Sequence, residues 1–198
     1  MNLLLRRMIL LLALVPGLAA ARDGYLWRHT GESLWAVSWE AAVPLTQLRA
    51  QLFPKWSPTG LQLEWRTGIT SRLSAGVAFS YNHFKNEGTQ GVSGKMNAVP
   101  VRGTIHYYVG PSALQPYFGV GIGVAWVEAA LTGATATRRF AFCADPQLGL
   151  LWTVGNGVAL NFIARYQFTT AAITFPEAPN ISVKNAQWAA LDVGIAFY

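Results

Sequence analysis

The chain closes with Trp188-Ala-Ala-Leu-Asp-Val-Gly-Ile-Ala-Phe-Tyr198, and this stretch decides the fold. In an extended strand, successive side chains point to opposite faces. One face of this strand is apolar, with Leu191, Val193, Ile195 and Phe197, and the other is small or charged, with Ala190, Asp192, Gly194 and Ala196. Such a strand suits the wall of a membrane barrel, with lipid outside and a polar lumen inside.

Residues 1–21 have the organisation of a secretory signal peptide. Arg6 and Arg7 precede an apolar run from Met8 to Val15, and small residues precede the polar Arg22. This run is shorter than the roughly 20 apolar residues of a transmembrane helix, although an N-terminal membrane anchor is the alternative. We therefore expect residues 1–21 to be a cleaved signal peptide and residues 22–198 to form one domain.

The composition favours a membrane protein built from strands. Hydrophobic residues make up 52% of the chain and charged residues only 12%, whereas about a quarter of the residues of a soluble domain are charged. Beyond the signal segment, the sequence contains no apolar stretch of about 18 residues, which excludes helical membrane spans. The 8 Trp, 7 Tyr and 10 Phe fit a lipid-facing surface with aromatic girdles.

Charge and cysteine usage narrow the set of partners. The net charge is +6, and for an exported protein the natural counter-charge is that of outer-membrane lipids and lipopolysaccharide. The sequence has no basic run or aromatic motif typical of nucleic-acid binding, so we expect no nucleic-acid partner. Cys143 is the only cysteine, which excludes an intrachain disulfide and a cysteine metal cluster. We expect no metal and no cofactor.

The alternation of apolar and polar residues continues along the whole mature chain and predicts eight strands. Connections around Ser71, Pro111 and Asn156 are short, whereas those after the first, third, fifth and seventh strands are longer, as in outer-membrane barrels. The fold class is therefore all-β, an eight-stranded antiparallel up-and-down transmembrane β-barrel. The expected strands are residues 34–43, 61–69, 73–84, 99–109, 116–127, 142–154, 158–168 and 188–198.

Two of the long connections carry further signals. Leu48, Leu52 and Phe53 lie within residues 45–60, so this segment is either a short amphipathic helix over the mouth or, as we favour, an ordinary loop packed on the rim. Residues 169–185 contain Pro176 and Pro179, so an irregular loop is expected there.

Several segments resemble the small outer-membrane β-barrel family with a transmembrane domain like that of outer-membrane protein A. They are the run from Ser38-Trp39-Glu40 to Pro44, Gly76-Val77-Ala78-Phe79, Tyr107-Tyr108-Val109-Gly110, Gln115-Pro116-Tyr117 and Asp145-Pro146-Gln147-Leu148-Gly149. The resemblance implies a bacterial outer-membrane location in a Gram-negative cell envelope. It leaves the activity open, since the group includes structural proteins, adhesins, channels and lipid-modifying enzymes.

The chain end resembles the closing strand that the barrel-assembly machinery reads in such proteins. This resemblance implies an assembly signal at Gly194, Phe197 and Tyr198. Phe197 is the outward aromatic residue, and Tyr198 is one residue beyond the usual pattern.

The inward positions of the expected strands carry a mixed set of charges. Because an eight-stranded barrel is just wide enough for its own side chains or one small ligand, these charges predict a salt-bridge network in the lumen. We expect a structural or surface-interaction protein whose lumen is closed by charge pairs; the alternative is a narrow, porin-like channel for small or hydrophobic molecules. The predicted lumen network is Glu40, Glu64, Arg66, Arg102, His106, Asp145, Arg165 and Asp192.

A lipid-modifying enzyme is a more distant possibility. Such enzymes use a histidine, a serine and an acid, and the candidate histidines are His29, His83 and His106. None of them has the His-x-Ser spacing of the barrel deacylases. We therefore expect no enzymatic activity and no catalytic residues.

Overall fold

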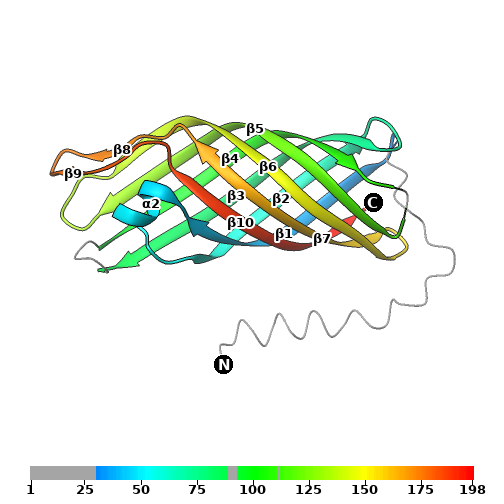
Figure 1. Ribbon diagram of the computed structural model, residues 1–198, viewed down its shortest axis with the longest axis horizontal. Helices are drawn as coiled ribbons and strands as arrows, with labels where there is room; N and C mark the ends of the chain where they lie inside the picture. The colour runs from blue at the N-terminus through cyan, green and yellow to red at the C-terminus, as the bar shows by residue number, and fades with distance from the viewer. Residues whose placement is uncertain (1–29, 89–92, 111) are drawn as a thin grey trace, which may run out of the picture.

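The computed structural model describes residues 30–88, 93–110 and 112–198, and these form a closed antiparallel β-barrel (Figure 1). The eight wall strands are β1 (Ser33–Pro44), β2 (Ser57–Gly68), β3 (Leu73–Glu87), β4 (Ser93–Tyr108), β5 (Leu114–Leu131), β6 (Thr137–Gly155), β7 (Val158–Thr169) and β10 (Gln187–Phe197). Around the barrel they follow the order β1-β10-β7-β6-β5-β4-β3-β2, so each wall strand pairs with the wall strands that precede and follow it, and β10 closes on β1.

This architecture confirms the predicted fold class. Burial alternates along the strands, as in β1, where every second side chain is buried inside the barrel and the intervening ones face outward. In the described part of the chain, no helix combines the length and the hydropathy that crossing a membrane requires. The predicted signal peptide, residues 1–21, and His29 lie outside the described residues.

The strand boundaries differ from prediction at one end of the barrel. β2 begins at Ser57 instead of Leu61, β4 at Ser93 instead of Val99, and β6 at Thr137 instead of Phe142. These extensions pair normally, as between β5 and β6, where Glu128 lies opposite Arg138. The outward side chains of the β2 and β4 extensions lack the apolar pattern, with Thr59, Lys95 and Asn97 among them, so the apolar alternation that marks a membrane wall ends before these strands do.

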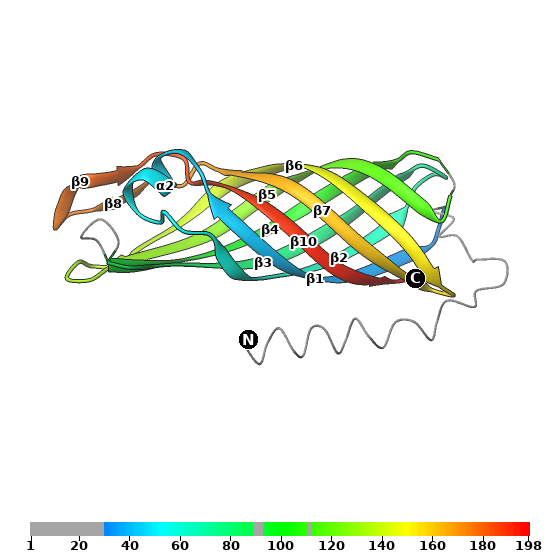
Figure 2. The ribbon, with the colours of Figure 1, turned by 60° about the horizontal axis from the view of Figure 1, so that its bottom comes forward.

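Short and long connections lie at opposite ends of the barrel. The connections β2–β3, β4–β5 and β6–β7 are short, and Gly157 adopts a positive φ of 72° in the last of them. Trp35, near the start of β1, pairs with Phe197, so both ends of the described barrel lie at this turn end (Figure 2). We call the opposite end the mouth.

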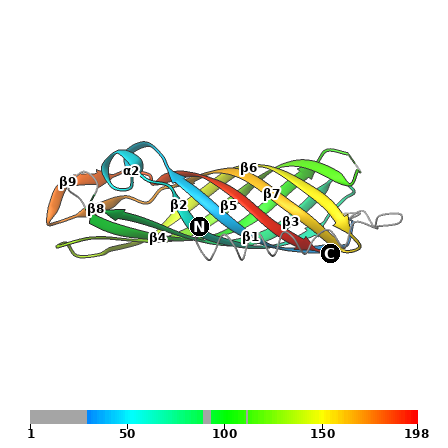
Figure 3. The same ribbon diagram turned by 90° about the horizontal axis from the view of Figure 1, so that it is seen from below.

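Two additional elements cover the mouth and correct the prediction (Figure 3). Helix α2 (Thr46–Gln51) replaces the ordinary loop that we favoured, because Leu48, Leu52 and Phe53 all pack inward against the barrel interior. Strands β8 (Ile173–Phe175) and β9 (Ala178–Val183) form a two-stranded hairpin where an irregular loop was expected. The hairpin accommodates Pro176 because this residue lies in the turn, outside the paired positions.

The interior is stacked in three layers along the barrel axis. An apolar layer lies at the mouth and includes Phe84, Met96 and Trp188 together with side chains of α2 and the hairpin. A second, smaller cluster lies at the turn end around Leu34 and Leu151. Buried charged and polar side chains occupy the space between the two clusters.

Candidate functional site

All eight charged residues predicted for the lumen lie inside the barrel. Each occupies an inward position of its strand, and the most accessible of them, Arg165, is only 5% exposed. They come from β1 (Glu40), β2 (Glu64, Arg66), β4 (Arg102, His106), β6 (Asp145), β7 (Arg165) and β10 (Asp192).

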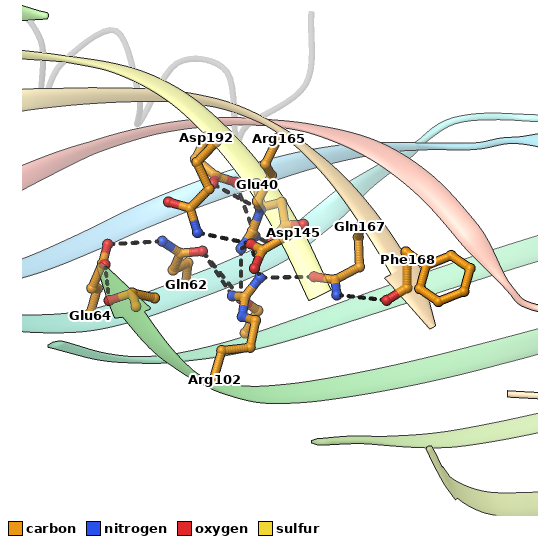
Figure 4. Close-up of polar contacts among 12 residues, drawn as sticks. Glu40, Gln62, Glu64, Arg102, Asp145, Arg165, Gln167, Phe168 and Asp192 are labelled. Carbon is orange, nitrogen blue, oxygen red and sulfur yellow. Dashed lines mark hydrogen bonds and ion pairs between the residues drawn. The ribbon is translucent and has the colours of Figure 1, made fainter. Parts of the chain in front are cut away.

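Arg165 lies at the centre of one group, as Figure 4 shows. Its guanidinium pairs with Glu40, lies 3.2 Å from Asp192 (Nε to Oδ2), and is 3.7 Å from Asp145 (Nη1 to Oδ2). Glu40 and Asp192 are register partners across the β1–β10 closure. Arg165 therefore compensates two carboxylates that face each other directly, a pair that would otherwise repel.

Arg102 organises the neighbouring group (Figure 4). Its Nη1 donates to Asp145 Oδ2 at 2.6 Å and to Gln167 Oε1 at 2.8 Å, while Nη2 donates to Gln62 Oε1 at 3.2 Å. Because Asp145 also pairs with Arg165, the two arginine groups share one carboxylate. A connected set of this kind holds strands from opposite sides of the barrel at fixed positions.

Arg66 forms the third group, toward the turn end. It pairs with Glu64 at 2.7 Å, donates to the Tyr108 hydroxyl at 2.9 Å and to the Tyr117 hydroxyl at 3.1 Å, and lies 4.7 Å from the centre of the Tyr117 ring. His106 Nε2 lies 3.0 Å from Gln147 Oε1 and 3.6 Å from Glu64 Oε1. A hydrogen bond of 3.3 Å from Gln62 to Glu64 links this group to that of Arg102.

Sequence reasoning selected the charged members of the network and missed the neutral ones. Gln62, Ser80 and Gln167 contact the arginines directly, and Tyr108 and Tyr117 hold Arg66. Each of these residues occupies an inward position, so the alternation that identified the charged residues could have identified these neutral ones as well.

The apolar mouth layer packs above the charge network. The Phe84 ring lies 5.7 Å from that of Trp188 and 6.3 Å from that of Phe53, and all three side chains are fully buried. Thr135, in the β5–β6 connection, donates a 2.7 Å hydrogen bond to Glu177 in the hairpin turn, which lowers the pKa of that exposed carboxyl. The hairpin is therefore fastened to the neighbouring connection as well as to the apolar layer.

The remaining predicted positions are distributed over the barrel. His106 lies in the lumen, whereas His83 faces outward with its Nδ1 2.7 Å from Asn97 Oδ1. Cys143 is buried and free, and the described residues contain no group of His, Cys, Asp and Glu arranged to hold a metal ion.

The predicted assembly signal lies at the turn end of β10. Gly194 packs closely against Ser38, Phe197 faces outward, and the Tyr198 hydroxyl donates to Thr153 at 3.2 Å. Strand β10 ends at Phe197, so Tyr198 follows the strand. Recognition of these residues by the assembly machinery stays a prediction.

The sequence matches no protein-family model and no curated protein. Among solved structures, the chain is similar to the outer membrane protein OprG from Pseudomonas aeruginosa (TM-score 0.58, 16% identity, 85% of this chain and 96% of that chain). It is also similar to Neisserial surface protein A, NspA (0.55, 15%, 83% and 94%). A third is Ail, the attachment invasion locus protein of Yersinia pestis (0.54, 12%, 85% and 98%). The chain therefore has the fold of the small eight-stranded outer-membrane β-barrels.

Proposed function

We propose that this chain is an integral protein of the bacterial outer membrane with a structural or surface-interaction role, its lumen closed by charge pairs. The outer wall supports the location. Large apolar side chains such as Ile122, 54% exposed, and Val124, 55% exposed, cover its middle. In water this surface would be an extended exposed apolar patch, which is unfavourable. In a lipid bilayer the same side chains contact acyl chains, so their exposure carries no such penalty.

The observation that best supports this role is that side chains fill the lumen at successive levels along the barrel axis. The Arg66 group lies toward the turn end, the Arg102 and Arg165 groups lie in the middle, and the apolar layer around Trp188 lies at the mouth. A path along the axis would require all of these to move together. The accessible surfaces are then the outer wall, α2 and the extracellular connections, which are the parts suited to a partner.

The names of two similar structures agree with this role. One is called a surface protein and the other an attachment invasion locus protein. We infer the same class of role for this chain from its filled lumen, and the narrow channel is the second candidate.

Conductance of the refolded barrel in a planar lipid bilayer tests the proposal. We expect no reproducible current steps from the wild type, with a heat-dependent shift in gel mobility verifying a closed barrel. Current steps whose size or ion selectivity changes in an Arg102→Ala variant would refute the closed lumen and support the narrow channel. A change in the mass of added lipopolysaccharide or phospholipid, measured after incubation with the barrel, would instead indicate an enzyme.

A further inference from the structure

A row of polar side chains runs across the outside of the barrel near the mouth. His83 in β3 pairs in register with Asn97 in β4, Asn97 with Glu128 in β5, and Glu128 with Arg138 in β6. Hydrogen bonds connect them: His83 contacts Asn97 at 2.7 Å, and Arg138 donates to Glu128 at 2.7 Å. The row is thus continuous over four adjacent strands of the outer wall.

Aromatic and apolar side chains lie directly below this row. The next outward position is Tyr81 in β3, Val99 in β4, Trp126 in β5 and Phe140 in β6, and Phe140 is 80% exposed. At the turn end, Tyr107 and Phe118 form a second aromatic pair with ring centres 5.2 Å apart. At typical strand rise and tilt, the distance from Tyr107 to Val99 along the barrel axis is roughly 20 Å, close to the height of the apolar band in outer-membrane barrels. The polar row therefore lies at the level of the outer lipid head groups.

Basic side chains gather just above the row. Lys85 and Lys95 are direct cross-strand partners, and Arg138 stands at the end of the row. Glu87 pairs with Lys85 at 2.7 Å and Glu128 with Arg138 at 2.7 Å, whereas Lys95 forms no ion pair within the described residues. Two lysines directly opposite each other on paired strands repel, and an anion bound between them would offset this repulsion.

A groove lies at the same place. It has a volume of about 280 Å³, and its lining includes His83, Lys85, Lys95, Ala130 and Thr132. Lys85, Lys95 and Ala130 in this lining occupy outward positions of their strands, above the polar row. The groove therefore offers cations and polar groups for a phosphate, with an apolar surface adjoining them for acyl chains.

In the other half of the wall, the described strands carry no outward charged side chain at the level of the row. At the corresponding level, the outward polar side chains are neutral: Thr59 in β2, Thr170 after β7 and Gln187 in β10, which accepts a 2.7 Å hydrogen bond from the Tyr166 hydroxyl. Among the wall strands, the outward cations at and above the row therefore lie on one side of the barrel, whereas Arg49 of α2 and Lys184 after β9 lie on the other side of the mouth, outside the wall strands.

We propose that this basic wall patch, Lys85, Lys95 and Arg138 with His83 and Asn97, binds the phosphorylated sugar head of a lipopolysaccharide molecule in the outer leaflet. The phosphate lies between Lys85 and Lys95, the polar row contacts the sugar, and the acyl chains lie against Trp126 and Phe140. This inference rests on the proposed outer-membrane location, and it assigns the lipid partner of the protein to one face of the barrel wall.

The test uses native mass spectrometry of the refolded full chain, counting bound bisphosphorylated lipid A. The double variant Lys85→Gln and Lys95→Gln should bind roughly tenfold to thirtyfold more weakly than wild type, since each lysine near a charged lipid surface contributes about 1 kcal/mol, or about fivefold. The matched control is Arg49→Gln with Lys184→Gln, which removes the same charge from the α2 side of the mouth and should bind like wild type.

Ligand variants separate the lipid from a free anion. Dephosphorylated lipid A with the same acyl chains should bind as weakly to wild type as lipid A binds to the double-lysine variant. Equal binding of the phosphorylated and dephosphorylated lipids, or an unchanged double-lysine variant, would overturn the proposal. Displacement of lipid A by millimolar inorganic phosphate would overturn it in favour of a small-anion site.

The outcome also distinguishes this inference from the function on which it rests. A chain that does not insert into phospholipid vesicles or show a heat-dependent mobility shift would refute the outer-membrane barrel itself. A barrel that inserts normally and shows no preference for lipid A refutes only the lipid site.

Discussion

Replacing Arg165 with Met should destabilise the barrel more than any single change on its surface. Within the described residues, the ion pairs of Glu40 and Asp192 are with Arg165, whereas Asp145 keeps Arg102 at 2.6 Å. The substitution therefore leaves two buried carboxylates uncompensated. Removing one partner of a buried ion pair costs about 3–5 kcal/mol, and we expect about 5 kcal/mol because the two carboxylates also face each other.

Urea unfolding of the refolded barrel, followed by tryptophan fluorescence, measures this loss. With a typical dependence of about 1–3 kcal/mol per molar urea, the midpoint should fall by roughly 2 M or more. Arg49→Met, at an exposed position of α2, is the control and should change stability by less than about 0.5 kcal/mol. The triple variant with Glu40→Gln and Asp192→Asn should recover most of the loss, because it removes both unpaired charges. A single variant within about 1 kcal/mol of wild type, or a triple variant no more stable than the single one, would refute the reasoning.

Three further substitutions test the apolar layer, the wall and the lipid-facing band. Trp188→Ala empties a fully buried site beside Phe84 and should cost about 3–5 kcal/mol, measured as a lower midpoint in the same urea titration; an unchanged midpoint would contradict the packed mouth. Gly123→Val should abolish the heat-shifted folded band, because its Cβ would clash with the backbone carbonyl oxygen of Val101. Gly103→Ala, whose Cβ would have no atom closer than 3.9 Å, should fold, and equal folding of the two variants would disprove the close strand approach. Ile122→Lys places a charge midway between the aromatic rows and should cost about 2–4 kcal/mol in vesicles, a loss whose absence would argue against the membrane band.

The wall of the barrel could be predicted because side-chain direction in a strand has a period of two. Asp192 and Arg165 point inward and Phe162 and Leu191 outward for this reason alone, whichever strands are paired. The alternation also explains the boundary errors. It reports contact with lipid, and the segments before Leu61 and Val99 continue as strands after that contact ends.

The partners within the lumen could not be predicted in the same way. An inward position does not give the height of a side chain on the barrel axis, which depends on the stagger of the strands. Arg165 thus pairs with Glu40, 125 residues away in the sequence, and shares Asp145 with Arg102.

The elements at the mouth depended on tertiary packing. Leu48 and Leu52 have helical spacing, and Leu48 lies in α2 while Leu52 follows its last residue. Both side chains belong to the same apolar cluster as Trp188 and Phe175, so the helix over the mouth depends on an apolar surface that distant parts of the chain supply. Pro176 suggested irregular structure and instead occupies the hairpin turn.

The apolar layer at the mouth connects parts of the chain that are far apart in sequence. Its covering helix follows β1, and Trp188 belongs to β10, the two strands whose pairing closes the barrel. If β1 and β10 were not paired, the side chains of α2 and Trp188 would lie in water. Their burial therefore stabilises the protein only when this last strand pair forms. Closure of the ring and sealing of its mouth are thus one cooperative event, and any change that loosens the covering helix should also make the β1–β10 seam easier to open.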